Sequence, residues 1–330
     1  MQARQARQAR QAGPARRGDR LIDLAFLAAA SLGAVAVSPA DAQEVAGLEP
    51  ADRRLGTARA GQPRVVGEGR LSGPETVLWD EAADVYLVSN INGELTVEDD
   101  NGFISRVSPD GEILELRWID GHDPSIVLHA PKGMIIVEDE LLVADLGAVR
   151  VFDRSTGALV RTHGAPDSYM LNDLAADAEG RIYVTDTGGE RSRPPGAVYR
   201  VAGEGEAVRI AEGAFLERPD GIVTDGRDLL VTTFAADANE VYRLTASGER
   251  TPYATLPDGQ LDGLLRLPDD SLLVTSWQGN AVYRLLGPQA RTVVGGIGSP
   301  AQIGYDEKRH QLLVPAPLAN RIMIYPLEWN

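Results

Sequence analysis

The stretch MLNDLAADAEGRIYVTDTGG, residues 170–189, has the pattern of two β-strands joined by a tight turn. The turn falls at residues 177–180, where Asp and Gly supply the backbone conformations that a hairpin needs. The second strand carries the apolar triad IYV at residues 182–184. The first strand begins with a polar pair, Asn172 and Asp173, although a buried strand favours apolar residues. The turn explains one polar cluster, and the polar pair needs another explanation.

The apolar triad of this hairpin recurs along the chain at intervals of roughly 40 to 55 residues. Its copies are YLV at 86–88, LLV at 141–143, IYV at 182–184, LLV at 229–231, LLV at 272–274 and LLV at 312–314. Each triad follows an apolar strand and precedes further strands, and little helical periodicity is visible beyond residue 37. Repeats of four short strands are typical of β-propeller blades. The sequence therefore predicts an all-β fold, a six-bladed β-propeller over residues 62–330.

The two ends of the chain predict how the ring of blades closes. The last repeat ends with RIMIYPLEWN at 321–330 and lacks the outermost strand of the other repeats. The segment PRVVGEG at 63–69 resembles ARTVVGG at 290–296 and precedes the first blade. We expect this N-terminal strand to pair into the last blade, because closure removes the exposed edges of an open array. Residues 43–61 are expected to form a flexible lead-in.

The N-terminal region has the composition of an export signal. Its first 20 residues carry six Arg, and the apolar run LAFLAAASLGAVAV follows at 24–37. This run is shorter than the roughly 20 residues that span a bilayer, and Ala40 and Ala42 fit the small-residue pattern of a signal-peptidase site. We interpret residues 1–42 as a cleaved signal peptide, which predicts a periplasmic or secreted protein without stable membrane insertion. A membrane anchor is the alternative interpretation.

Charge and composition disfavour several classes of function. The chain of 330 residues has a formal net charge of −16, which argues against nucleic acid and anionic membranes as partners. It contains no Cys, so thiol nucleophiles, disulfides and thiolate zinc sites are excluded. Its four His residues show no zinc-binding spacing. We expect a monomer that acts on a small-molecule substrate.

One position stands out when the six repeats are aligned on their triads. The innermost strands begin with the words PETV, PKGM, LNDL, PDGI, LDGL and PAQI. The second residues of these words are Glu75, Lys132, Asn172, Asp220, Asp262 and Ala301. These positions are expected to converge, because the innermost strands of a propeller surround one axis. Confined carboxylates repel one another unless they are protonated or bridged by a cation, and oxygen ligands favour Ca²⁺ first, with Mg²⁺, Mn²⁺ or Zn²⁺ as alternatives.

Other interpretations stay open on the residues alone. Asp-Gly and Asn-Asp are common turn dipeptides, so any one word by itself indicates a loop. Their recurrence at one phase of the repeat favours a shared site. Lys132 could neutralise part of the cluster, bind a substrate oxyanion, or point away from the axis.

The same words resemble those of a known family. GPETVLWD at 73–80, LNDLAADAEGRIYVTDTG at 171–188, PDGIVTDG at 219–226 and LDGLLRLPDDSLLVTSW at 261–277 resemble the regucalcin/gluconolactonase family of six-bladed propellers, over residues 64–330 in all. The resemblance implies a divalent metal held by Glu75 and Asp262, with Asp262 also serving as a base. It implies that Asn172 lies on the substrate side.

The chain departs from the family pattern at two positions. Asp220 stands where the family has a metal-binding Asn, which keeps an oxygen ligand and adds negative charge. Met170 stands two residues before Asn172, where family members that act on sugar lactones resemble one another in carrying Arg. The second departure weakens the prediction of a sugar lactone as the substrate and favours a more apolar lactone or another ester.

Two functions are consistent with these features. One is an exported metal-dependent hydrolase, a lactonase in its simplest form, and the other is a non-catalytic propeller whose structural metal supports a ligand- or protein-binding surface. For the hydrolase we expect Glu75, Asp220 and Asp262 at the metal, Asp262 or Asp220 as general base, and Asn172, Lys132 and Met170 at the substrate.

Overall fold

The chain forms a ring of antiparallel β-sheets. The computed structural model describes residues 58–189, 193–201, 203 and 205–329. Five sheets consist of four strands that follow one another in the sequence. Blade 1 contains β3 (Pro74–Asp80), β4 (Val85–Asn90), β5 (Phe103–Val107) and β6 (Ile113–Asp120). Blade 2 contains β7 (Pro131–Val137), β8 (Glu140–Asp145), β9 (Ala148–Asp153) and β10 (Leu159–Gly164).

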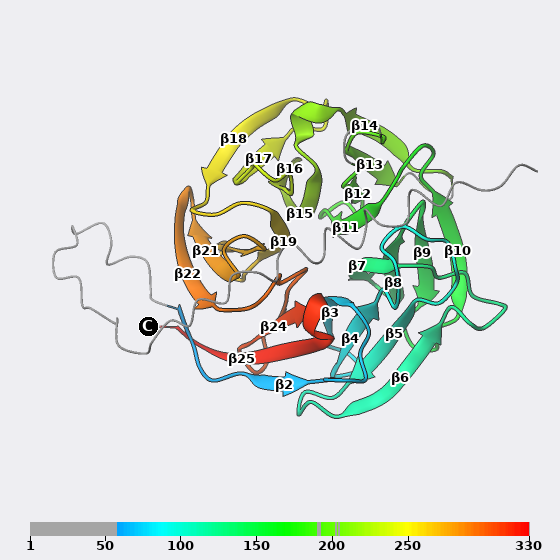
Figure 1. Cartoon of the computed structure of the whole chain (residues 1–330). Coiled ribbons are helices and arrows are strands. Elements are labelled where there is room, and N and C mark those ends of the chain that lie inside the picture. The colour runs from blue at the N-terminus through cyan, green and yellow to red at the C-terminus, as the bar shows by residue number, and fades with distance from the viewer. Residues whose placement is uncertain (1–57, 190–192, 202, 204, 330) are drawn as a thin grey trace, which may run out of the picture. The chain divides into compact units, whose positions relative to one another are not determined.

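The next three blades repeat this arrangement. Blade 3 contains β11 (Leu171–Ala176), β12 (Ile182–Asp186), β13 (Ala197–Val201) and β14 (Val208–Glu212). Blade 4 contains β15 (Pro219–Asp225), β16 (Asp228–Thr233), β17 (Glu240–Leu244) and β18 (Arg250–Thr255). Blade 5 contains β19 (Leu261–Arg266), β20 (Leu272–Ser276), β21 (Ala281–Leu286) and β22 (Gln289–Gly295). Figure 1 shows that the first strand of each of these five blades lies innermost.

The sixth blade is built from both ends of the described chain. It contains β23 (Gly304–Asp306), β24 (Gln311–Ala316) and β25 (Arg321–Trp329), and two N-terminal strands, β1 (Ala58–Ala60) and β2 (Arg64–Val66), both pair with β25. The register places Arg64 opposite Ile324 and Ala58 opposite Trp329. The all-β six-bladed propeller closed by an N-terminal strand, which the sequence predicts, is confirmed.

Some sequence predictions fall outside the described residues. The expected signal peptide, residues 1–42, lies there, as do residues 43–57 of the expected lead-in. The last part of that lead-in contains β1, which is paired with β25. Among the described residues no helix is long and apolar enough to cross a membrane. The helical segments of this part of the chain are two short 3₁₀ turns, Ala214–Leu216 and Pro317–Ala319.

Packing between neighbouring blades explains why the triads are apolar throughout. All six residues of β4 are buried, because this strand lies inside its sheet and both faces meet another blade. Between blades 2 and 3, Leu142 and Val151 pack with Leu174 and Val184 in one apolar cluster. A strand covered on both faces lacks the alternation of a half-exposed strand, so it appears in the sequence as an unbroken apolar run.

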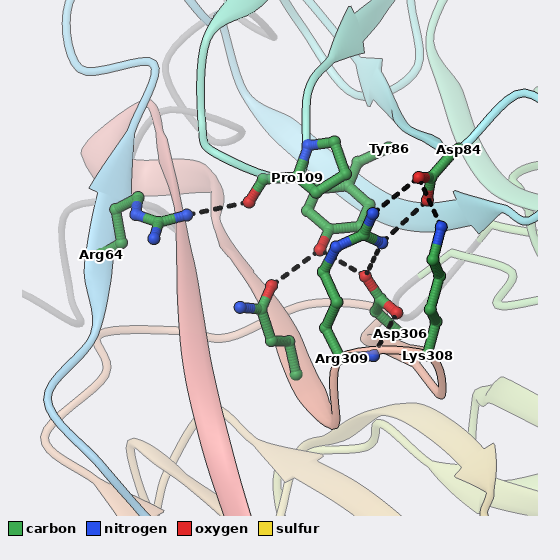
Figure 2. Close-up of polar contacts among 8 residues, drawn as sticks. Arg64, Asp84, Tyr86, Pro109, Asp306, Lys308 and Arg309 are labelled. Atoms are coloured by element: carbon green, nitrogen blue, oxygen red, sulfur yellow. Dashed lines mark hydrogen bonds and ion pairs between the residues drawn. The ribbon is translucent and has the colours of Figure 1, made fainter.

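Polar contacts reinforce the joint between the first and last blades (Figure 2). The Tyr86 hydroxyl donates to Asp306 Oδ2 at 2.7 Å and lies 2.8 Å from Gln311 Oε1. The guanidinium of Arg309 donates to both carboxylate oxygens of Asp84, at 2.8 and 2.6 Å, and to Asp306 Oδ2 at 2.9 Å. These groups connect segments more than 200 residues apart in the sequence, so they stabilise ring closure beyond the strand pairing.

A pair of Tyr variants tests this joint. We expect Tyr86→Phe to lower the free energy of unfolding by about 1–2 kcal/mol, because the buried Asp306 carboxylate loses a hydrogen bond. Tyr242→Phe is the matched control, since Tyr242 is equally buried and its hydroxyl has no hydrogen-bond partner in the described part of the chain. Urea unfolding of both variants makes the comparison. Equal losses in the two variants would contradict a role of Tyr86 in closure.

Candidate functional site

The residues singled out by the repeats lie in a β-bulge that recurs in five inner strands. In β11 the register shifts between Leu171 and Leu174, so Asn172 and Asp173 drop out of the ladder with β12. The same shift occurs at the start of β3, β7, β15 and β19. A bulge bends the strand and redirects a side chain that the regular pleat would place elsewhere. The polar pair that the turn did not explain therefore occupies a bulge.

A hydroxyl from the neighbouring strand binds the backbone amide in four of these bulges, and three of the four hydroxyls also bind the next blade. Thr185 of β12 accepts a hydrogen bond from the Asp173 amide at 3.0 Å and donates to the Asp220 carbonyl of the next blade at 2.6 Å. Thr232 does the same for the Gly221 amide and the Asp262 carbonyl, at 2.7 and 2.9 Å. Ser89 makes the equivalent contacts between blades 1 and 2. One hydroxyl thus positions two consecutive site residues.

The sequence contains a signal for these hydroxyls. Ser89, Thr185 and Thr232 each follow directly after an apolar triad. Thr275 occupies the same phase in blade 5, and its hydroxyl accepts the Gly263 amide at 2.7 Å. In blade 2 the phase is filled by Ala144, which has no hydroxyl. A small hydroxyl residue after a triad therefore identifies the bulges that are fixed in this way.

Four side chains from four blades form what we call the candidate cluster: Glu75, Asn172, Asp220 and Asp262. All four are at least nine-tenths buried. Asn172 Nδ2 donates to Asp220 Oδ2 at 3.0 Å, and the Thr187 hydroxyl lies 3.2 Å from the same oxygen. Trp277 Nε1 donates to Asp262 Oδ2 at 2.9 Å. Their convergence is what the phase of the repeats predicts.

Burial raises the pKa of all three acids of the candidate cluster, and charge repulsion adds to this effect for two of them. Desolvation raises the pKa of Glu75 to about 7, although a hydrogen bond from Thr76 and the charge of Lys132 act in the opposite direction. Desolvation and the Glu75 charge raise the pKa of Asp220 to about 8. The pKa of Asp262 is raised well above its ordinary value by burial and by the charges of Asp220 and Glu75. Strongly shifted acids in one buried place are typical of functional sites.

Lys132 carries a positive charge into this environment. It is buried, and its Nζ donates to the carbonyls of Leu95 at 3.1 Å and Ala130 at 3.2 Å. Burial lowers the pKa of Lys132, and the charge of Glu75 is the largest influence that opposes this. The lysine charge in turn lowers the pKa of Glu75 and Asp220. Of the three roles considered from the sequence, this position favours partial neutralisation of the cluster.

Two oxygen atoms of the candidate cluster lack a partner. Within the described part of the chain, Asn172 Oδ1 and Asp262 Oδ1 are buried and accept no hydrogen bond. Buried polar groups nearly always have a partner, so these two oxygens are free to accept an ion or a water molecule. Oxygen donors fit a hard divalent cation. Among the described residues, however, no group of three or more His, Cys, Asp and Glu side chains is arranged to hold a metal as it stands. The divalent cation therefore stays a prediction.

Arg218 is a residue that the sequence reasoning missed. It stands two residues before Asp220, the phase that Met170 occupies before Asn172. Both residues bind, through their backbone carbonyls, the amide that follows the second strand: Met170 binds Thr187 at 3.0 Å and Arg218 binds Phe234 at 2.9 Å. Inspecting this phase in every repeat, and not only in the third, would have found Arg218.

An aromatic pair connects Arg218 with the candidate cluster. The Arg218 Cζ atom lies 5.3 Å from the centre of the Phe234 ring, within cation–π distance. Phe234 packs edge-on against Trp277 at 5.3 Å between ring centroids, and Trp277 donates to Asp262. The charge of Arg218 also lowers the pKa of Asp220. A cation and two aromatic rings thus border the acids on the side of blades 4 and 5.

Comparison with known proteins places the chain in a family. Residues 74–303 match the family described as SMP-30/Gluconolactonase/LRE-like region, so the chain belongs to this family. This agrees with the resemblance seen in the sequence.

Solved structures show the same fold. A gluconolactonase from Xanthomonas campestris is 17% identical over 85% of this chain and 94% of its own, with a TM-score of 0.64. A putative gluconolactonase is 18% identical over 86% and 97%, with a TM-score of 0.61. A virginiamycin B lyase from Staphylococcus aureus, solved with quinupristin, is 16% identical over 82% and 100%, with a TM-score of 0.54. No curated protein sequence matches this chain.

The raised pKa values predict how the stability of the metal-free protein, kept in a chelator, depends on pH. The folded state holds the protons of Glu75 and Asp220 more tightly than the ordinary pKa values of 4.5 and 3.8 allow. Their contribution to stability is therefore fully present below about pH 4 and is lost as the pH rises through about 7 and 8. We expect the melting temperature to fall between pH 5.5 and 8.5, and the double variant Glu75→Gln/Asp220→Asn to flatten this fall. An unchanged slope in the double variant would count against this assignment.

Proposed function

We propose that this member of the family is an exported, monomeric hydrolase that opens a lactone or a related ester with the help of a divalent cation, Ca²⁺ first. The observation that carries the proposal is the candidate cluster, in which three buried acids and an amide converge and two oxygens accept no hydrogen bond in the described part of the chain. Membership of a gluconolactonase-like family supports the reaction class. The Arg-rich, apolar N-terminal segment supports export.

The site residues have different roles in the proposed reaction. Glu75, Asp220 and Asp262 would hold the cation, which when bound would polarise the substrate carbonyl and favour ionised carboxylates. Asp262, oriented by Trp277, takes a proton from the attacking water. The water oxygen forms a bond to the carbonyl carbon, the bond from that carbon to the ring oxygen breaks, and the departing oxygen takes the proton back from Asp262 to give a hydroxy acid. Asn172 orients the substrate.

The second candidate function is a non-catalytic propeller in which the cation has a structural role. The position of Lys132 favours it, because an internal ammonium already offsets part of the acidic charge. Met170 at the substrate-side phase also favours it, since this side chain provides no charged contact. The two functions differ in whether variants of the cluster remove turnover or only lower stability.

An isosteric variant of the base separates these functions. We expect Asp262→Asn to lower kcat on a responsive lactone at least 100-fold, because the amide cannot take a proton. Asp80→Asn is the matched control: Asp80 is a fully buried carboxylate at the other end of an inner strand, paired with Arg154. Turnover of a lactone panel with Ca²⁺, Mg²⁺, Mn²⁺ or Zn²⁺ provides the measurement. The non-catalytic function would be favoured if the wild-type protein hydrolyses no lactone of the panel and Asp262→Asn only lowers the melting temperature.

Arg218 provides a test of substrate selection. Because its charge reaches the candidate cluster, we expect Arg218→Gln to raise KM about tenfold for lactones that carry a carboxylate, with little effect on neutral lactones of the same ring size. Arg209→Gln is the control. Arg209 also contacts an aromatic ring, that of Tyr199 at 5.5 Å, but it lies on β14, the outer strand of blade 3. Equal changes in KM for charged and neutral substrates would reject selection by charge.

A further inference from the structure

A second layer of residues lies one position further along each inner strand. Its members are Thr76, Gly133, Asp173, Gly221, Gly263 and Gln302. Asp173 and Gln302 have the longest side chains of this layer, and they occupy the space that glycines leave. A Cβ atom on Gly133 would lie 2.7 Å from Asp173 Oδ1, and one on Gly263 would lie 2.5 Å from Gln302 Oε1. Larger residues at these glycines would collide with the two polar side chains.

Asp173 and Gln302, which we call the floor, join blades that are remote in the sequence. Gln302 Nε2 donates to Asp173 Oδ2 at 2.9 Å, and the two residues are 129 positions apart. The other contacts of the floor reach three further blades through backbone groups. They include Ile222 N to Asp173 Oδ2 at 3.0 Å, Leu264 N to Gln302 Oε1 at 2.9 Å, and Gln302 N to the Glu75 carbonyl at 3.0 Å. The two side chains thus link blades 3, 4, 5 and 6, and the Gln302 backbone adds a contact with blade 1.

Gln302 of the floor also lines a separate cavity. This cavity of about 310 Å³ is lined by Thr76, Gln302 and residues further along the inner strands, including Trp79, Met134 and Leu265. None of the residues of the candidate cluster lines it. The layer of Thr76 and Gln302 therefore lies where the inner strands change from the polar cluster to this largely apolar space.

The carboxylate of the floor interacts with the acids of the cluster. Asp173 is only 2% exposed and accepts hydrogen bonds from the amides of Leu174 and Ile222. Burial raises its pKa, and the charges of Glu75 and Asp220 raise it further. The charge of Asp173 in turn raises the pKa of Asp262. The hydrogen bonds from Leu174, Ile222 and Gln302 act in the opposite direction and favour the ionised carboxylate. Because Coulomb interactions are weakly screened in a buried site, this charge would strengthen the attraction of the cluster for a cation.

We propose that Asp173, held in place by Gln302, is a positioning residue that fixes the bulges of the candidate cluster and adds its negative charge to the attraction for the divalent cation. The inference rests on the proposed function only in assuming that the cluster binds a cation. It does not depend on which ester is hydrolysed, or on whether one is.

Calcium titration of the metal-free protein tests the proposal with CaCl₂ as the probe. We expect Asp173→Asn to weaken Ca²⁺ binding at least tenfold, measured by isothermal titration calorimetry, because the shape is kept while the charge is lost. Asp80→Asn is the control, because it removes a buried charge from a different place, the far end of β3 in blade 1. It should leave the Kd for Ca²⁺ unchanged. Asp173→Asn with wild-type affinity would overturn the proposal.

A swapped pair separates positioning from folding alone. The double variant Asp173→Asn/Gln302→Glu returns one carboxylate and one amide to the floor with their places exchanged. We expect it to recover the melting temperature and most of the Ca²⁺ affinity, whereas Gln302→Leu should weaken affinity severalfold while the Asp173 charge remains. If Asp173→Asn does not fold, the swapped variant decides, and a folded swapped variant without Ca²⁺ affinity would overturn the proposal.

The outcomes also separate this proposal from the proposed function. Wild-type protein that binds Ca²⁺ but hydrolyses no lactone would reject the hydrolase, and the Asp173 variants would still decide the role of the floor. Active wild-type protein whose Ca²⁺ affinity is insensitive to Asp173→Asn would reject the floor alone. Wild-type protein without affinity for any divalent cation would reject both.

Discussion

The convergence of six inner strands on one axis is the constraint on which the rest of this protein depends. Backbones that approach so closely leave room for few side chains, and glycines at positions 133, 221 and 263 make the approach possible. The same crowding concentrates charge. Glu75, Asp220 and Asp262 would be dispersed on an ordinary sheet, whereas here the charge of Glu75 raises the pKa of Asp220, and both charges raise the pKa of Asp262.

Such a concentration of buried acids has to be held in place. The bulge that turns each side chain toward its neighbours breaks the regular ladder, so the freed backbone groups need new partners. Ser89, Thr185 and Thr232 supply them, and each hydroxyl satisfies an amide in one blade and a carbonyl in the next. The geometry of the cluster is therefore a property of the whole ring. The contacts between Tyr86, Asp84, Asp306 and Arg309 at the joint contribute to it by keeping the ring closed.

The comparisons separate the framework from the site. Structures that are 16–18% identical to this chain share its fold, so the fold tolerates extensive substitution. The proposed chemistry depends on the few residues at the axis. Asp220, Met170 and Arg218 are the positions where this chain differs from what its resemblance implies or adds to it. They are therefore the positions most informative about its substrate.

The sequence by itself determined the number of blades, the closure and the phase of the candidate residues. These follow from local periodicity, because a strand buried on both faces must be apolar and a repeat must return to the same place in each blade. Tertiary structure alone decided which groups meet at that place. The Lys132 ammonium binds a carbonyl 37 residues away, and Gln302 binds Asp173 across 129 residues. The aromatic pair that places Arg218 beside the cluster comes from two different blades. Such pairings leave no periodic trace in a single sequence, because hydrogen bonds form according to the direction and distance of groups in the folded ring.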